Sequence, residues 1–119
     1  MIEKIIQDYV DAWNSLDSQA RINLMDKVLA ESCLYLDSHL PDPITGKEPH
    51  CLFIDRFKSK FPDLRLNLIA SPDSHHGYFR FQWQMLKGDD ELFIQGSFFG
   101  EVNEQQQITK LVGFVNKSD

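Results

Sequence analysis

Apolar side chains recur every three or four positions near the start of the chain, which is the period of an amphipathic helix. This pattern predicts a first helix over residues 2–13 with a wide apolar face. A second helical pattern runs from Arg21 to Leu29, and Asp17 or Ser15 is able to cap its start. The first part of the chain is therefore expected to be helical.

A third helix is expected after a loop rich in proline and glycine at residues 41–46. Thr45 is the predicted cap of this helix, and Pro49 is tolerated in a first turn. The helix should stop at Phe61, because Pro62 disfavours helical geometry at the residue before it. Ahead of the loop, residues 32–37 form a short apolar run that predicts a strand.

After residue 62 the apolar positions alternate with polar ones, which is the period of a half-buried strand. The strands are expected at residues 64–70, 78–85, 92–102 and 108–116. Turn residues separate them, so they should form an antiparallel meander. Helices followed by a long sheet define an α+β fold. A strongly curved sheet of this kind would wrap around the third helix and leave a cavity between its concave face and the helices.

Length and composition limit the possible partners. The chain has 119 residues, enough for a single domain over 1–119, and a formal charge of −6. Because its basic residues are dispersed, we expect neither a nucleic acid nor an anionic membrane as partner. No apolar run approaches the ~20 residues that span a bilayer, and residues 1–8 lack a signal-peptide pattern, so a cytoplasmic location is expected.

Two cysteines, Cys33 and Cys51, fit a reducing compartment as free thiols, although the sequence leaves a disulfide between them open. Neither has a neighbour at ligand spacing, so no metal site is predicted.

Several short segments, in this order, resemble the nuclear transport factor 2-like superfamily in its SnoaL-like or ketosteroid isomerase-like branch. They cover nearly the whole chain and are Tyr9-Val10-Asp11-Ala12-Trp13-Asn14-Ser15-Leu16-Asp17, Tyr35-Leu36-Asp37, Gly46, Gly96-Ser97-Phe98 and Ile108-Thr109-Lys110-Leu111-Val112-Gly113-Phe114. The resemblance implies a cone-shaped α+β barrel with a deep pocket, commonly a homodimer through the outer sheet face. It does not imply one activity, since members include isomerases, cyclases, dehydratases and proteins without chemistry.

In the ketosteroid isomerase pattern, a tyrosine of the first helix and a protonated aspartate stabilise an oxyanion while a strand-end aspartate moves the proton. The tyrosine falls at Tyr9 and the base at Asp37. The third position falls at Phe98, which cannot donate a hydrogen bond, so the resemblance does not supply a complete triad.

Asp37 is the leading catalytic candidate from the residues themselves. It closes the apolar run before Ser38-His39-Leu40-Pro41, and burial at a strand end would raise its pKa toward that of a general base. The alternative is an exposed aspartate that caps Leu40 or the next amides.

Tyr9 and His50 are the other two catalytic candidates. Tyr9 lies on the apolar helix face, and its hydroxyl needs a partner such as a substrate oxygen or Asp37. His50 shares a helix face with Ile54 and Phe57, where it would orient Asp37 or act as an acid. The alternatives are core packing for the tyrosine and a core-edge histidine bonded to a backbone carbonyl.

An aromatic cavity is the expected binding site for a hydrophobic small molecule. Its predicted lining residues are Trp13, Tyr35, Trp83, Phe98 and Phe114. The same residues would otherwise be ordinary core. The sequence and the resemblance thus predict a SnoaL-like domain with a hydrophobic small-molecule pocket and leave three functions open. The first is an isomerase or lyase without cofactor that acts on an apolar carbonyl compound. The others are a non-catalytic small-molecule-binding module and a dimerising scaffold.

Overall fold

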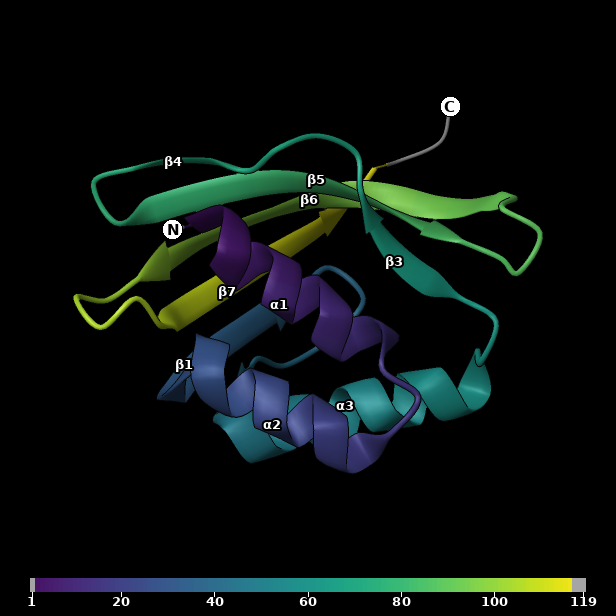
Figure 1. Ribbon diagram of the computed structural model, residues 1–119, viewed down its shortest axis with the longest axis horizontal. Helices are drawn as coiled ribbons and strands as arrows, with labels where there is room; N and C mark the ends of the chain where they lie inside the picture. Colours follow the sequence, from purple (N-terminus) through teal and green to yellow (C-terminus); the bar gives the residue numbers. More distant parts are fainter. Residues whose placement is uncertain (1, 117–119) are drawn as a thin grey trace.

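Three helices lie on one side of a curved sheet in the computed structural model, which describes residues 2–116 (Figure 1). The helices are α1 (Ile2–Asn14), α2 (Ser18–Val28) and α3 (Lys47–Lys60). The strands are β1 (Leu29–Asp37), β2 (Ile44–Thr45), β3 (Arg65–Leu68), β4 (Asp73–His75), β5 (Tyr78–Leu86), β6 (Leu92–Val102) and β7 (Ile108–Val115). Helix α1 packs on α2 and on β3, whereas α3 packs on α2 and on strands β1 and β2 of the sheet.

The helix starts follow from local chemistry. Asp17 caps α2, since its Oδ2 accepts a hydrogen bond from the Ala20 amide at 3.1 Å. The predicted Thr45 cap of α3 is wrong, because Thr45 pairs with Leu34 of β1 and belongs to β2. Gly46 stands at the start of α3 instead, with φ of 100°, a backbone conformation that favours glycine. The chain therefore turns from β2 into α3 at Gly46.

The sheet has the strand order β2-β1-β7-β6-β5-β3, and β4 pairs separately with β5. The predicted meander is confirmed, because β3–β5, β5–β6 and β6–β7 are antiparallel. Strand β1 lies parallel to β7, which makes the sheet mixed. The α+β class and the cone-like arrangement are confirmed, but the sheet is open and not a closed barrel.

The inner face of the sheet carries the core. On β5, Phe79, Phe81, Trp83 and Met85 are buried, whereas the residues between them are more exposed. This alternation places Trp83 on the side of the helices, a point that the sequence left open. On β6, Phe98 is buried on the same inner face. The helices and the inner face of the sheet thus enclose one aromatic core.

Candidate functional site

A cavity of about 200 Å³ lies between helices α1 and α3 and the inner face of the sheet. Its wall is almost entirely apolar and is formed by Trp13, Tyr35, Asp37, His39, Leu40, Phe53, Phe57, Leu66, Trp83, Met85, Ile94, Phe98 and Val115. An apolar cavity of about 150 Å³ holds benzene. The volume therefore suits a compound of one or two rings.

Six aromatic rings from five elements line this wall. Trp13 of α1 meets Phe57 of α3 edge to face, with ring centroids 5.3 Å apart. Tyr35 of β1 lies 5.6 Å from Phe53 of α3, centroid to centroid. Trp83 of β5 and Phe98 of β6 lie 5.7 Å apart. These rings pack against one another and present apolar surface to the cavity, so the wall has few polar groups.

Asp37 is the one carboxylate that residues 2–116 place on the wall of the cavity. Residues two apart on a strand share a face, so Tyr35 lies beside it, and the Tyr35 hydroxyl donates to Asp37 Oδ2 at 2.7 Å. The backbone amide of His39 donates to Oδ1 at 2.9 Å. Asp37 thus caps the turn after β1, as the alternative interpretation expected, and it also lines the cavity.

The environment of Tyr35 keeps its hydroxyl protonated. Burial raises the pKa of Tyr35 well above its ordinary value, and Tyr9 and Asp37 raise it further.

The neighbouring strand β7 leaves room for the Asp37 carboxylate. A Cβ at Gly113 of β7 would lie 2.6 Å from the Phe98 ring and 3.4 Å from Asp37 Oδ2. Glycine at this position lets Phe98 and Asp37 share the wall.

Tyr9 and His50 form a buried pair behind the Tyr35 ring and do not line the cavity. The Tyr9 hydroxyl lies 2.9 Å from His50 Nε2, and both side chains are fully buried. This partner differs from the substrate oxygen and the Asp37 carboxylate that the sequence suggested for Tyr9. It also replaces the backbone carbonyl suggested for His50. The His50 ring centroid is 4.5 Å from that of Tyr35.

Burial determines the protonation of this pair. It lowers the pKa of His50 to about 4, so the imidazole is neutral at neutral pH. Burial also raises the pKa of Tyr9 well above its ordinary value, although the Trp13 indole opposes this. Among the residues described, His50 Nδ1 has no hydrogen-bond partner.

Four of the five predicted binding residues line the cavity, namely Trp13, Tyr35, Trp83 and Phe98. Phe114 does not, because side chains alternate along β7 and Gly113 occupies the inner position. Phe114 lies on the outer face and is 57% exposed. Sequence reasoning missed Phe53 as a lining residue, although its spacing of four from Phe57 on α3 was a usable signal.

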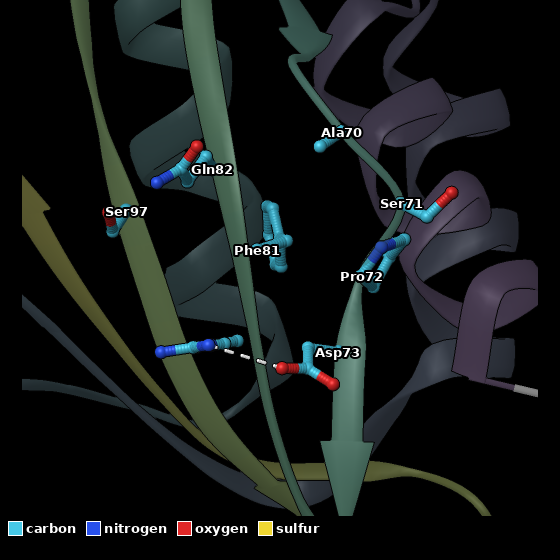
Figure 2. A pocket seen from close by; sticks show the side chains of 8 residues that line it. Ala70, Ser71, Pro72, Asp73, Phe81, Gln82 and Ser97 are labelled. Atoms are coloured by element: carbon cyan, nitrogen blue, oxygen red, sulfur yellow. Dashed lines mark hydrogen bonds and ion pairs between the residues drawn. The ribbon is translucent and has the colours of Figure 1, made fainter.

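A second hollow of about 410 Å³ lies beside the connection from β3 to β4 (Figure 2). Figure 2 shows Ser71 and Pro72 on this connection, across from Gln82 and Ser97 of the sheet. Its only charged lining groups are Asp73 and Arg80, which form an exposed ion pair at 3.2 Å. It shares no lining residue with the aromatic cavity. Because it holds no desolvated reactive group, the aromatic cavity is the candidate site.

No arrangement within residues 2–116 suits a metal ion, since three or more His, Cys, Asp or Glu side chains do not gather anywhere in that range. Cys33 and Cys51 are both buried and free, which resolves the open question of their pairing. Burial raises the pKa of Cys33 to about 12, so its thiol is a poor nucleophile at neutral pH. None of the described helices has the length and apolar character needed to cross a membrane.

The fold and the site together are those of an open α+β cone that surrounds an aromatic pocket. Neither family models nor curated proteins give a match. Among solved structures, the chain is 29% identical to a candidate isomerase of the SnoaL-like family from Agrobacterium tumefaciens, with a TM-score of 0.89 over 96% of each chain.

Two further solved structures share the fold at lower identity. A candidate ketosteroid isomerase from Kribbella flavida is 19% identical, with a TM-score of 0.73 over 99% of this chain and 79% of that one. A protein with a ketosteroid isomerase-like fold from Catenulispora acidiphila, solved with trimethylamine, is 12% identical, with a TM-score of 0.73 over 92% and 83%. The chain thus has the fold of the nuclear transport factor 2-like superfamily, among its SnoaL-like and ketosteroid isomerase-like members.

Proposed function

We propose that the cavity binds a small apolar carbonyl compound and that Asp37 moves a proton on the carbon next to the carbonyl group. The protein would then be an isomerase or lyase that needs no cofactor. The observation that supports this most is that Asp37 is the only carboxylate that the described residues place on a largely apolar, aromatic wall. A carboxylate in such a place has few competing partners and is available to a bound carbon acid.

The hydrogen bonds of Asp37 are compatible with this role. Each of its oxygens accepts one bond, from Tyr35 or from the His39 amide. A carboxylate has about four acceptor sites, so acceptor capacity remains for a substrate proton. The two bonds fix the orientation of the carboxylate, which favours proton transfer at a defined position.

An oxyanion donor other than Tyr9 is required, because Tyr9 is bonded to His50 and lies behind the wall. Trp13 and Trp83 are the two candidates. Both side chains line the cavity, and both indole nitrogens are buried without a hydrogen-bond partner among the described residues. A ligand oxygen that reached one of these N–H groups would complete its hydrogen bonding. One donor contributes about 10²–10³ in rate, so we expect modest catalysis.

The volume of the cavity limits the size of the substrate. About 200 Å³ accommodates one or two rings, so the substrate should be smaller than a four-ring steroid. The proposed substrate class is therefore a monocyclic or bicyclic ketone or enone.

Deuterium exchange tests the proposal without knowledge of the natural substrate. The protein is incubated in D₂O with acidic cyclic ketones such as 2-tetralone, and NMR follows the loss of the α-proton signal. We expect exchange above the buffer rate, reduced at least about a hundredfold by Asp37→Asn. Asp42→Asn, at an exposed loop position, is the matched control and should retain the rate. Exchange at the wild-type rate in Asp37→Asn would rule out this residue as the base.

A binding module without turnover is the second candidate. It is favoured by Phe98, which stands where the family pattern has a proton-donating group, and by the bond that holds Tyr9 away from the cavity. Saturable binding of the ketones with no exchange above buffer would identify this function.

The proposal includes a homodimer formed through the outer face of the sheet. Tyr78 and Phe99 stack on this face with ring centroids 5.8 Å apart, and they are 43% and 44% exposed. Phe114 adds a third exposed ring on the neighbouring strand. Exposed aromatic residues on one face are typical of association surfaces.

A further inference from the structure

We infer that the cavity accepts a small organic cation, such as a tertiary or quaternary ammonium group, with Asp37 as its counter-ion. The inference rests on the cavity of the proposed function but not on proton transfer. It concerns the charge of the ligand, which the proposed catalytic role leaves unspecified.

The first argument is the arrangement of the rings. Six aromatic side chains line the cavity, namely Trp13, Tyr35, Phe53, Phe57, Trp83 and Phe98. They come from α1, α3 and three strands, so they approach a ligand from several directions. An aromatic face is electron-rich, and a cation within about 6 Å of a ring centroid is attracted to it. Such cages suit alkylammonium groups, whose charge is spread over apolar methyl groups.

The second argument is the charge of the wall. Among the residues described, Asp37 is the only acidic residue on the wall and no Lys or Arg side chain lines it, while His39 is the one other titratable group of the wall besides Tyr35. The two bonds to Asp37 come from a hydroxyl and an amide, both neutral. In the part of the chain that the structure describes, no ion pair includes Asp37. The carboxylate therefore lacks the positive partner that a half-buried charge favours.

Two lysine side chains contact aromatic rings that lie outside the cavity wall. Lys60 lies over the Phe61 ring at 5.6 Å, and Lys87 lies over the Phe93 ring at 5.8 Å. Neither ring lines the cavity. Within residues 2–116, a ligand cation would thus meet no Lys or Arg side chain on the wall. The formal charge of −6 also attracts cations to the protein as a whole.

A matched pair of probes isolates the effect of the charge. Choline and 3,3-dimethylbutan-1-ol have the same shape, but the first has a quaternary nitrogen where the second has a carbon. Calorimetric titration at fixed ionic strength should show choline binding at least about tenfold more tightly, which corresponds to about 1.4 kcal/mol. Asp37→Asn should abolish most of this preference.

A second variant tests the rings independently of the carboxylate. Phe53→Leu keeps an apolar side chain in the half-buried wall but removes a ring face, so it should weaken choline binding severalfold and leave the neutral probe nearly unchanged. Phe114→Leu, which removes an exposed ring on the outer face, is the matched control and should bind both probes like the wild type. Retention of the native fold by each variant is checked by NMR.

The outcomes separate the two proposals. Equal affinity for choline and its neutral analogue would overturn the inference, and so would undiminished choline binding by Asp37→Asn. Failure of choline to bind at millimolar concentration would overturn it too. In each case the exchange of ketone protons remains an independent measurement of the proposed function. Charge preference without ketone exchange would support the inference and refute the catalytic role.

Discussion

Mild acid should destabilise this protein through His50. Burial lowers the pKa of His50 in the folded protein to about 4, against an ordinary value of 6.5. The unfolded chain therefore binds a proton at this residue below about pH 6.5, whereas the native state does not until about pH 4. Protons bind preferentially to the unfolded state in this window, so the free energy of unfolding falls as the pH falls.

The structure sets the size of this effect. The two pKa values differ by about 2.5 pH units, and each unit corresponds to about 1.4 kcal/mol. The contribution of His50 to stability should thus decrease by about 3 kcal/mol between about pH 7 and about pH 4, and then level off. This is a large fraction of the 5–15 kcal/mol that is typical of native proteins.

Urea unfolding across this pH range measures the effect, with His50→Gln as the test variant. Glutamine does not titrate, and its amide is able to bond the Tyr9 hydroxyl that His50 now contacts. The variant should be less stable at neutral pH because its packing is altered, but its stability should fall by about 3 kcal/mol less on acidification. His39→Gln, at an exposed position, is the control and should follow the wild type.

Parallel stability curves for the wild type and His50→Gln would refute this reasoning. A direct NMR titration gives the same answer from the native state. The His50 ring signals should stay in the neutral form down to about pH 5. Titration near 6.5 in the folded protein would mean that the imidazole is solvated, and the buried Tyr9 bond would then be wrong.

Two further predictions concern the sheet. Gly96→Ala would place a Cβ 2.0 Å from the Phe114 carbonyl oxygen, so it should lower the free energy of unfolding by about 1–3 kcal/mol in urea unfolding. Gly88→Ala is the control, because its Cβ would meet nothing closer than 4.0 Å, and its stability should be nearly that of the wild type. Phe99→Asp should convert the proposed dimer to a monomer in sedimentation velocity, because it places a charge in the outer aromatic face, while Leu16→Asp should not. A dimer that persists in Phe99→Asp would place the interface elsewhere.

Much of the fold was predictable because periodicity reports which face of an element is buried. The alternation along β5 and β6 and the spacing of α1 are local properties of the sequence, and they predicted these elements closely. Strands β2 and β4, with two and three residues, are too short to carry a period. They form only because β1 and β5 offer free pairing partners.

The candidate site was predictable only in part, since a side chain's partner depends on distant elements. Asp37 bonds Tyr35 and caps a turn through contacts within two residues, and such contacts follow from local sequence. The Tyr9 bond to His50 joins residues 41 positions apart, so no local pattern reveals it. For Phe114, the alternation of β7 was visible, but its inward face depended on pairing with β1 and β6.

The buried pair and the cavity carboxylate have separate roles in this structure, although a family pattern groups them. Tyr9 lies at the position of an oxyanion donor, yet its hydroxyl is bonded to a neutral imidazole behind the Tyr35 ring. The bond ties α1 to α3 inside the core and leaves the cavity with Asp37 and Tyr35 as its bonded polar pair. A substrate whose oxyanion needs two strong hydrogen-bond donors would be poorly stabilised in this cavity. A small ligand whose charge or acidic proton meets one carboxylate among aromatic rings fits better, and the choline and ketone measurements distinguish these two ligands.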